Sequence, residues 1–376
     1  MPLPSSSSLL SQGKKSRILP VILVTYPDTF TLQEAKSLVD SSDRSIIAVF
    51  TQKYLNHSEY GIGSGKAEEI KELVKESKAE QIVVDEQITS KQIYNLEKLT
   101  GAKVIDRERL ILDIFYSRAT TNEAKLQIQL AEIKYNMPRV REIAKMMASS
   151  NERPGKGGSG EYTVDVKFRD LKRRMSSIKD KLKEAKSKRE LYHQQRVKSG
   201  MPIVSLVGYT SAGKTTLFNL LTSEHKETAS KLFTTLSTTT RSVKLDEKTS
   251  VLLTDTVGFI SRLPTYMIDA FKSTLEESLQ ADLILLLVDS SEDLESEIQV
   301  KYSSCWDVLK ELNVDPTKVH VVLTKYDDGG ANDQKVGEIT KGLKLQDPVL
   351  VVSSKTGYGI HKLKNIIKNN VMKPSA

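Results

Sequence analysis

The chain is poor in the residues that mark several protein classes. It has one cysteine, Cys305, among 376 residues, so it can form no internal disulfide, which fits a reducing compartment. Glycine (19 residues) and proline (11 residues) are sparse, which excludes a collagen-like or largely low-complexity chain. The longest uniformly aliphatic run, Leu283–Val288, is far shorter than the ~20 residues of a membrane span. We therefore expect a cytoplasmic protein without membrane segments.

Length and composition bound the architecture. At ~150 residues per domain the length predicts two or three domains, and a hydrophobic fraction of 38% supplies their cores. Residues 1–17 are rich in serine and lack the apolar core of a signal peptide, so we expect a disordered leader. The rest divides into three regions of different character, residues 18–115, 116–199 and 200–376.

The first region alternates β-rich runs with helical patterns, which predicts a small α/β domain over 18–115. Its expected strands are Leu19–Thr25, Ile46–Thr51, Gln81–Asp85 and Lys103–Ile105. The stretch Gly61–Lys66 is rich in glycine but lacks the spacing and the trailing Ser or Thr of a phosphate loop. A tight turn into a helix over Ala67–Ser77 is the favoured interpretation, and a contact with ATP or RNA is the alternative.

Residues 116–199 have a helical pattern. Apolar residues step by three and four along Leu126–Met147 and Leu171–Ala185, which gives each helix one apolar seam. The stretch Arg153–Gly160 between them contains four glycines and a proline, which interrupt a helix. We predict two long helices joined by this loop and packed as an antiparallel hairpin.

The second of these helices holds the basic charge. Val164–Gly200 contains thirteen Lys and Arg against five Asp and Glu, so its net charge of +8 equals that of the whole chain. A solvated helix face and a contact with a polyanion both account for this charge, and nucleic-acid phosphate is the obvious polyanion.

The third region predicts a doubly wound α/β domain, with strands at Ile203–Val207, Val251–Thr254, Asp282–Asp289, Val319–Leu323 and Val349–Val352. After the first strand comes Gly208-Tyr209-Thr210-Ser211-Ala212-Gly213-Lys214-Thr215, a complete phosphate-loop pattern followed by a helical run from Thr216. Backbone N–H groups of such a turn point at phosphate. Lys214 is expected to hold the β- and γ-phosphate oxygens, and Thr215 to bind Mg²⁺.

Two segments downstream complete the phosphate side. Asp255-Thr256-Val257-Gly258 ends an apolar strand, so Asp255 can hold a Mg²⁺-bound water while the Gly258 N–H meets the γ-phosphate. Phe233-Thr234-Thr235-Leu236 lies between the phosphate loop and that strand. A threonine there can close on Mg²⁺ when the γ-phosphate is present.

Two further segments predict which nucleotide base the domain binds. Thr324-Lys325-Tyr326-Asp327 follows a strand, and Ser353-Ser354-Lys355 follows another on the base side. A carboxylate at Asp327 can accept from both guanine N1–H and N2–H, whereas adenine would leave it unpaired. Each segment alone is common, but their order and strand-end placement are typical of translation-factor GTPases. The domain is thus predicted to bind GTP.

From about residue 19 onward the sequence resembles the HflX family of ribosome-associated GTPases. The matching stretches are Gly61–Ile70, Val104–Arg107, Leu110–Phe115, Arg118, Lys125–Gln127, Leu130-Ala131, Gly157–Glu161, Gly208–Asn219 and Asp255–Ile260. The resemblance implies a Mg²⁺-dependent GTPase that hydrolyses GTP to GDP and phosphate and binds the large ribosomal subunit. It further implies a role in splitting or rescuing stalled ribosomes, with the hairpin loop and the N-terminal domain touching ribosomal RNA. A monomer is expected of a ribosome ligand.

Carried onto this sequence, the resemblance assigns roles residue by residue. Lys214, Thr235 and Gly258 are the expected catalytic positions, with Thr235 favoured over Thr234 as the Mg²⁺ ligand beside Thr215 and, through water, Asp255. The expected nucleotide contacts are Gly208, Tyr209, Thr210, Ser211, Ala212, Gly213, Lys214, Thr215, Thr216, Phe233, Thr234, Thr235, Asp255, Thr256, Val257, Gly258, Thr324, Lys325, Asp327, Ser353, Ser354 and Lys355.

The chain departs from the family pattern at three places. Ser211 replaces an Asn that helps to bind a monovalent cation, which puts potassium stimulation in question. Thr324 replaces an Asn whose amide ties the segment Thr324–Asp327, the base loop, to the phosphate loop. Thr324 keeps a hydroxyl but loses that amide, so we expect somewhat weaker nucleotide binding, with guanine choice kept by Asp327. Ser237-Thr238 replaces Asp-Pro, which predicts a more mobile switch. Phe259 stands where Ras-like proteins have a water-orienting Gln, which predicts slow hydrolysis that a partner accelerates.

Two other functions remain open at this stage. One is a non-enzymatic RNA- or ribosome-binding module for which nucleotide is a regulatory ligand. The other is an ATP-driven RNA remodeller that uses the N-terminal domain. Multiple-turnover phosphate release distinguishes the first from an enzyme, and ATP hydrolysis by the N-terminal part distinguishes the second.

Overall fold

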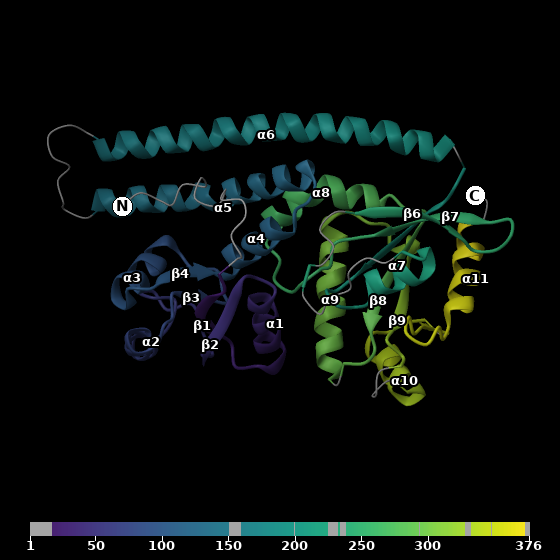
Figure 1. Ribbon diagram of the computed structural model, residues 1–376, viewed down its shortest axis with the longest axis horizontal. Helices are drawn as coiled ribbons and strands as arrows, with labels where there is room; N and C mark the ends of the chain where they lie inside the picture. The colour runs from purple at the N-terminus through teal and green to yellow at the C-terminus, as the bar shows by residue number, and fades with distance from the viewer. Residues whose placement is uncertain are drawn as a thin grey trace. The chain divides into compact units, whose positions relative to one another are not determined.

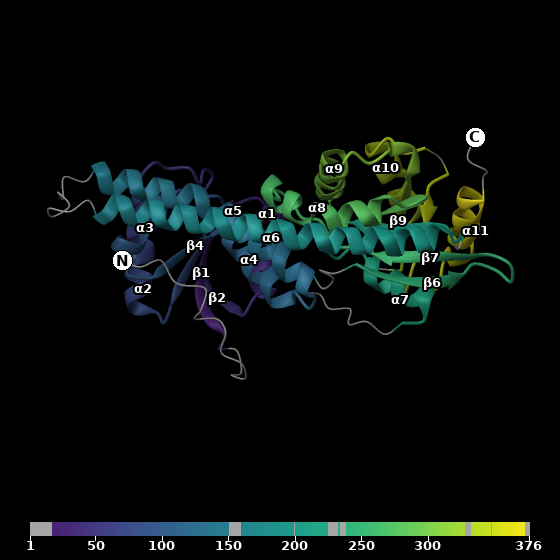
Figure 2. The same cartoon turned by 90° about the horizontal axis from the view of Figure 1, so that it is seen from above.

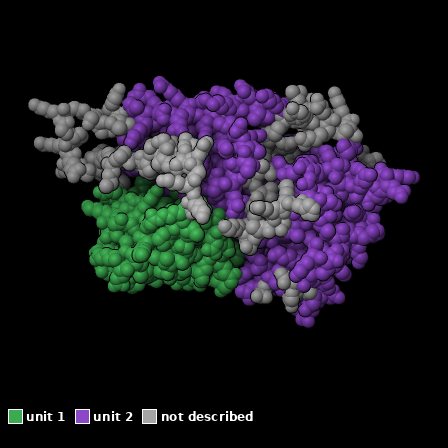
Figure 3. Space-filling view, in the orientation of Figure 1, with its two compact units in different colours: residues 1–110 green, residues 111–376 purple. Residues whose placement is uncertain are grey.

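The computed structural model describes residues 17–149, 159–198, 200–224, 232–233, 238–292, 294–327, 332–346 and 348–372. The chain divides into two compact units, residues 1–110 and 111–376, which Figure 3 colours separately. Except for Arg17, the expected leader lies outside the described residues, and so does most of the glycine-rich loop. Within the described part, no helix is both long enough and apolar enough to cross a membrane.

The first unit is a parallel sheet with helices between its strands. Its order is β2-β1-β3-β4, with β1 at the centre beside both β2 and β3. The elements in chain order are β1 (Leu19–Thr25), α1 (Thr29–Asp40), β2 (Arg44–Thr51), α2 (Ser64–Glu76), β3 (Gln81–Val84), α3 (Ser90–Thr100) and β4 (Lys103–Asp106). The next helix, α4 (Arg107–Arg118), begins in the first unit and has most of its residues in the second. The prediction of a small α/β domain is confirmed.

Local sequence explains where helices of this unit start and stop. Asp28 caps α1 by accepting from the Thr31 N–H at 2.8 Å. Thr89 and Gln92 form a reciprocal capping box at the start of α3, and Gly101 ends that helix with φ of 75°, which suits glycine. Apolar residues from the sheet and from α2 and α3 pack into one core.

The helical hairpin consists of α5 (Asn122–Ser149) and α6 (Ser159–Lys198). Figures 1 and 2 show the two helices side by side. The predicted seam packs as expected, because Leu130, Ile133 and Ile178 form a buried cluster. Two details differ from the sequence prediction: α6 already begins at Ser159, within the predicted loop, and α5 continues through Pro138.

The rest of the second unit is a doubly wound sheet of order β10-β9-β8-β5-β7-β6. Its elements are β5 (Ile203–Gly208), α7 (Lys214–Thr222), β6 (Thr239–Lys244), β7 (Ser250–Asp255), α8 (Thr265–Leu279), β8 (Leu283–Asp289), α9 (Glu295–Glu311), the short 3-10 helix η2 (Pro316–Lys318), β9 (Val319–Thr324), α10 (Asp333–Gly342), β10 (Leu350–Val351) and α11 (Ile360–Val371). The predicted doubly wound fold is confirmed.

One strand of this sheet was not predicted. β6 lies at the edge and runs antiparallel to β7, whereas the other pairs are parallel. Its sequence, Thr-Thr-Arg-Ser-Val-Lys, has one buried residue, Val243, so it lacks the apolar run that marks a central strand. By contrast all seven residues of β8 are buried, which matches its nearly continuous aliphatic sequence.

Candidate nucleotide-binding site

The phosphate loop connects β5 to α7 and is held close to the sheet. Gly208 ends β5 where a Cβ would lie 2.5 Å from the Leu287 carbonyl oxygen on β8, so no side chain fits there. Gly213 precedes α7 with a left-handed φ of 87°, which also favours glycine. The loop therefore passes over the end of the sheet, and its last residues turn directly into a helix N-terminus, the arrangement that binds phosphate.

Lys214 is buried within this loop. Its ammonium donates to the carbonyl oxygens of Gly208 at 3.0 Å and Tyr209 at 2.7 Å. Burial lowers the pKa of Lys214 to about 8, against the opposing effect of the nearby Asp255 carboxylate. A buried ammonium held across the loop is placed to meet a polyanion, whose charge would favour its protonated form.

The predicted metal ligands of the described part meet at the end of β7. The Thr215 hydroxyl donates to Asp255 Oδ2 at 3.1 Å, and Asp255 is fully buried. A hydroxyl beside a carboxylate is an oxygen-only donor set, which suits a hard cation such as Mg²⁺. Thr234 and Thr235 lie outside the described residues.

The segment after Asp255 is fastened to the phosphate loop. The Thr210 N–H donates to the Phe259 carbonyl at 2.7 Å, and the Phe259 N–H donates to the Gly208 carbonyl at 3.1 Å. The Tyr209 hydroxyl accepts from the Ser261 N–H at 2.7 Å. Gly258 consequently lies against the loop, where an added Cβ would be 2.8 Å from Thr210 Cγ2 and 3.1 Å from Lys214 Nζ.

The base loop is tied to the phosphate loop through Thr324. Its hydroxyl donates to the Ala212 carbonyl at 2.9 Å and lies 3.2 Å from the Val288 carbonyl. The expectation that replacing Asn by Thr removes this tie is therefore wrong, because the shorter side chain reaches a loop carbonyl directly. Weaker nucleotide binding than with asparagine stays a prediction.

Asp327 is oriented by the second base segment. The Ser353 hydroxyl donates to Asp327 Oδ1 at 2.5 Å and itself accepts from the N–H groups of Lys355 and Thr356. Lys355 Nζ lies 3.8 Å from Asp327 Oδ2. The structure thus brings together the two segments that the sequence assigns to the base.

Two contacts in this area were not predicted from the sequence, one through Asp289 and one between two tyrosines. Lys325 pairs with Asp289 at 2.5 Å, which joins the base loop to the end of β8. The rings of Tyr326 and Tyr358 stack at 4.9 Å between centroids, linking the two base segments. A carboxylate at the carboxyl end of a buried strand was a usable signal for Asp289, whereas nothing in the sequence pairs the tyrosines.

The other predicted contacts are distributed around this core. Thr216 is exposed on the first turn of α7, Val257 is buried, and the Thr256 hydroxyl donates to the Leu206 carbonyl at 2.7 Å. Ser211 is exposed with φ of 63°. Ser354 is partly buried after β10.

Phe233 has a different environment from the phosphate loop. Its ring packs edge-on against the ring of Phe115 in α4, with 4.7 Å between the ring centroids. The Phe115 ring in turn packs edge-on against that of Phe271 in α8, with 5.2 Å between centroids. Phe233 is 3% exposed. Its side chain therefore anchors the chain just before Thr234, and any contact with nucleotide would come from its main chain.

The first unit uses its glycine-rich stretch for folding. Gly61 has φ of 76° and abuts Ile88, the Gly63 N–H donates to Gln52 at 3.1 Å, and the Lys66 ammonium donates to the Thr51 carbonyl. The favoured interpretation, a tight turn into a helix, agrees with this arrangement, and α2 starts at Ser64.

Charged residues close the carboxyl ends of strands in the first unit. Arg107 donates to Asp85 and to Glu34, both at 2.6 Å, and the Thr25 hydroxyl donates to Asp85 at 2.8 Å. Burial alone would lower the pKa of Arg107, but the two carboxylates outweigh it and raise that pKa. At this edge, where open α/β sheets bind ligands, the side chains of the first unit pair with one another.

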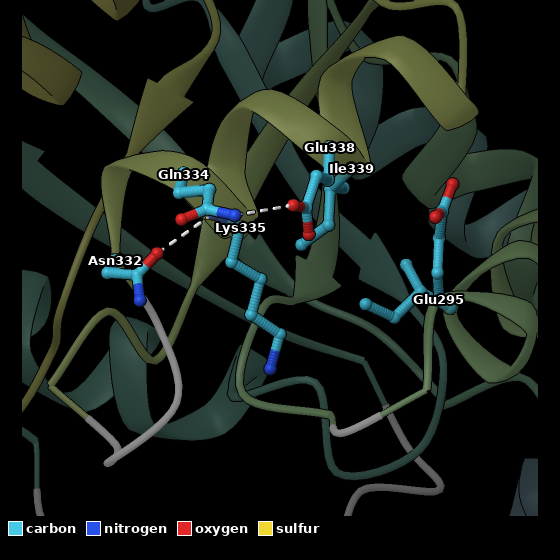
Figure 4. A pocket seen from close by; sticks show the side chains of 7 residues that line it. Glu295, Asn332, Gln334, Lys335, Glu338 and Ile339 are labelled. Carbon is cyan, nitrogen blue, oxygen red and sulfur yellow. Dashed lines mark hydrogen bonds between the residues drawn. The ribbon is translucent and has the colours of Figure 1, made fainter.

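A separate pocket of about 280 Å³ lies between α9 and α10 (Figure 4). Glu295, Lys335 and Glu338 are among its lining residues. None of the residues assigned to nucleotide lines it, so it is distinct from the phosphate and base loops. Within the described residues, no group of three or more His, Cys, Asp or Glu is placed to hold a metal.

Fold and loop geometry together define a P-loop GTPase domain. Family profiles match consecutive stretches of the chain: "GTP-binding GTPase N-terminal" over residues 30–116, "GTP-binding GTPase Middle Region" over 118–196 and "50S ribosome-binding GTPase" over 203–325. A GTP-binding protein from Sulfolobus solfataricus, solved in complex with GDP, shares the fold with a TM-score of 0.50 and 24% identity, covering 94% of this chain and 99% of that chain.

Curated relatives extend over nearly the whole sequence. GTPase HflX of Methanocaldococcus jannaschii is 46% identical over 310 residues, which are 82% of this chain and 75% of that protein. GTPase HflX of Thermococcus kodakarensis is 37% identical over 364 residues, or 95% of this chain and 81% of that protein. The chain belongs to the HflX family of GTPases, as the sequence resemblance predicted.

Proposed function

We propose that this protein is a Mg²⁺-dependent GTPase that binds the large ribosomal subunit and hydrolyses GTP to GDP and phosphate. The observation that carries the proposal is the connection between its two recognition loops. Thr324 ties the base loop to the phosphate loop, and Ser353 orients Asp327 on the same side of the sheet. One nucleotide can therefore be held at both ends by preformed groups.

The phosphate groups are assigned by chemistry. Lys214 would neutralise the β- and γ-phosphates, and the Gly258 N–H would meet the γ-phosphate as its charge develops. Thr215 and Asp255 would hold Mg²⁺, Asp255 through a water, and the ion would offset charge on the phosphate oxygens. Thr235 is proposed as the third metal contact on the sequence alone.

Selection of guanine would come from Asp327. Its side chain is 11% exposed, so an unpaired carboxylate there is costly. Guanine offers two N–H donors to it and adenine offers neither, which favours GTP over ATP.

Docking on the ribosome would use the basic helix. The apolar seam of α6 packs on α5, and this leaves ten lysine and arginine side chains between residues 167 and 188 exposed. Such a surface suits the phosphates of ribosomal RNA, and its affinity should fall steeply with salt. Splitting or rescue of stalled ribosomes, a monomeric state and a cytoplasmic location complete the proposal.

Hydrolysis would be slow without the ribosome. The Phe259 ring is 2% exposed and has no group that can orient water. A partner that orders the segments around Thr235 and Gly258 would raise the rate, and the ribosome would tighten GTP binding by the same factor as GTP tightens docking.

The test is GTP turnover by the full chain with Mg²⁺ at low salt, alone and with isolated large or small ribosomal subunits. We expect strong stimulation by large subunits, little by small subunits, and loss of turnover with a chelator. Tight GTP binding without multiple-turnover phosphate release would instead indicate a nucleotide-regulated binding module. Turnover of ATP in place of GTP would contradict the assignment of Asp327.

A further inference from the structure

The side chain of Tyr209, the second residue of the phosphate loop, is enclosed by protein. The residue is 5% exposed, and Lys301 of α9 lies over its ring, with 5.8 Å between the Nζ atom and the ring centroid. Its hydroxyl oxygen accepts a hydrogen bond from the Ser261 N–H at 2.7 Å. The side chain is therefore engaged with the segment that follows Asp255 rather than open to a ligand.

The main chain of Tyr209 lies between the proposed catalytic groups. Its carbonyl oxygen accepts from the Lys214 ammonium at 2.7 Å. On its other side, Tyr209 and Phe259 are neighbours in a parallel β-bridge. The Phe259 N–H donates to the Gly208 carbonyl at 3.1 Å, and the Thr210 N–H donates to the Phe259 carbonyl at 2.7 Å. One residue thus contacts both the lysine and the segment that carries Gly258.

The hydroxyl adds a second attachment to the Gly258 segment, residues 258–261. The main-chain bonds hold this segment at Phe259, and the Tyr209 hydroxyl holds its end at Ser261. Ser261 is 6% exposed, so loss of this partner for its N–H would be costly. At the other end, a Cβ added to Gly258 would be 3.1 Å from Lys214 Nζ. The attachments together keep Gly258 beside the lysine.

We propose that Tyr209 is a positioning residue for GTP hydrolysis. Its hydroxyl, by binding the Ser261 N–H, holds the Gly258 segment where the Gly258 N–H meets the γ-phosphate. This inference rests on the proposed GTPase function. Tyr209 acts through the segment, and its hydroxyl touches neither the nucleotide nor the attacking water. Because GDP has no γ-phosphate, the hydroxyl should matter for the triphosphate and not for the diphosphate.

The experiment compares the full chain with Tyr209→Phe, which keeps the ring and removes the hydroxyl. Single-turnover hydrolysis of bound GTP is measured together with the affinities for GDP and for a non-hydrolysable GTP analogue. Hydrogen exchange, followed by mass spectrometry on a peptide spanning residues 255–262, reports on the segment itself. Tyr26→Phe is the matched control, because it removes a hydroxyl that donates to Glu86 at 2.7 Å in the first unit.

Loss of this hydrogen bond should slow hydrolysis by about 5- to 20-fold in Tyr209→Phe, the size expected for one buried bond. Affinity for the analogue should fall by up to about fivefold, and affinity for GDP should stay within about twofold, which also shows that the variant folds. Exchange in the peptide should become faster. Tyr26→Phe should match the wild type in all four measurements.

An unchanged rate in Tyr209→Phe would overturn the inference, and so would a slower rate with unchanged hydrogen exchange. Affinity for GDP that falls in parallel with the rate would also overturn it, because the hydroxyl would then support the whole loop. Tighter binding of the analogue would show that the bond holds the segment away from the γ-phosphate. A wild-type chain that binds GTP but releases no phosphate would instead overturn the proposed function, so the wild-type arm separates the two failures.

Discussion

The two α/β units place polar residues at the same point of their sheets and use them differently. In the second unit, the strands that end at Gly208, Asp255 and Thr324 lead to the phosphate loop, which holds a buried lysine, and to the two segments that contact this loop. In the first, the residues at the strand ends, Thr25, Asp85 and Arg107, pair with one another and with Glu34. One crevice presents its groups to a ligand, whereas the other satisfies them internally.

The difference teaches that the position in the fold does not by itself make a site. A parallel sheet always brings loops together at its carboxyl edge. What distinguishes the second unit is glycine where the backbone must pass closely, and a lysine whose ammonium donates to two carbonyl oxygens of the loop. In the first unit, Arg107 is paired with two carboxylates, Asp85 and Glu34. Their negative charge would repel a triphosphate.

The largest effect should come from breaking the closed crevice. Arg107→Ala leaves Glu34 and Asp85 as buried carboxylates without their cation and should destabilise the protein by about 3–5 kcal/mol. Urea unfolding followed by circular dichroism measures this change. Lys75→Ala, which removes an exposed partner of Glu72, is the control and should hardly move the midpoint. Equal effects of the two substitutions would show that the Arg107 network does not hold the first unit together.

The two lysines that follow glycine-rich turns offer the next comparison. Lys214→Ala should lower kcat/KM for GTP by about 10²–10³-fold, because it removes the ammonium group that is expected to neutralise the γ-phosphate. Lys66→Ala should stay within about twofold, because that ammonium binds a carbonyl of its own unit. Steady-state phosphate release measures both. A matching loss in Lys66→Ala would mean that the first unit takes part in nucleotide chemistry.

A smaller effect on stability should separate a buried aromatic ring of the second unit from an exposed ring of the first. Phe115→Leu keeps an apolar side chain but loses two edge-on ring contacts, so it should destabilise the protein by about 1–2 kcal/mol. Tyr94→Leu in α3 alters a ring that is 51% exposed and should change little. Thermal unfolding of both variants gives the comparison. An unchanged midpoint in Phe115→Leu would show that the cluster with Phe233 adds no stability.

Much of this arrangement could be predicted from the sequence. The phosphate loop, Asp255 and Asp327 can be predicted because their chemistry requires fixed residue types next to strands. Both sheets can be predicted because β-rich runs alternate with helical patterns along the chain. The edge strand β6 was missed because a solvated strand buries one side chain and needs no apolar run.

Contacts between distant segments were also beyond the sequence. The bond from Thr324 to Ala212 depends on the distance between two loops, and a rule drawn from asparagine gave the wrong result. The contact of the Thr210 methyl group with Gly258 depends in the same way on how the Gly258 segment packs against the loop. Spacing along the chain identifies such residues but does not place them.

The central claim is that one unit binds nucleotide and the other does not. Calorimetric titration of the full chain with GDP and with ATP, in wild type and in Lys214→Ala, tests it directly. The account predicts one GDP per chain, loss of that binding in Lys214→Ala, and no ATP binding in either. A second nucleotide per chain, or ATP binding that survives in Lys214→Ala, would contradict it.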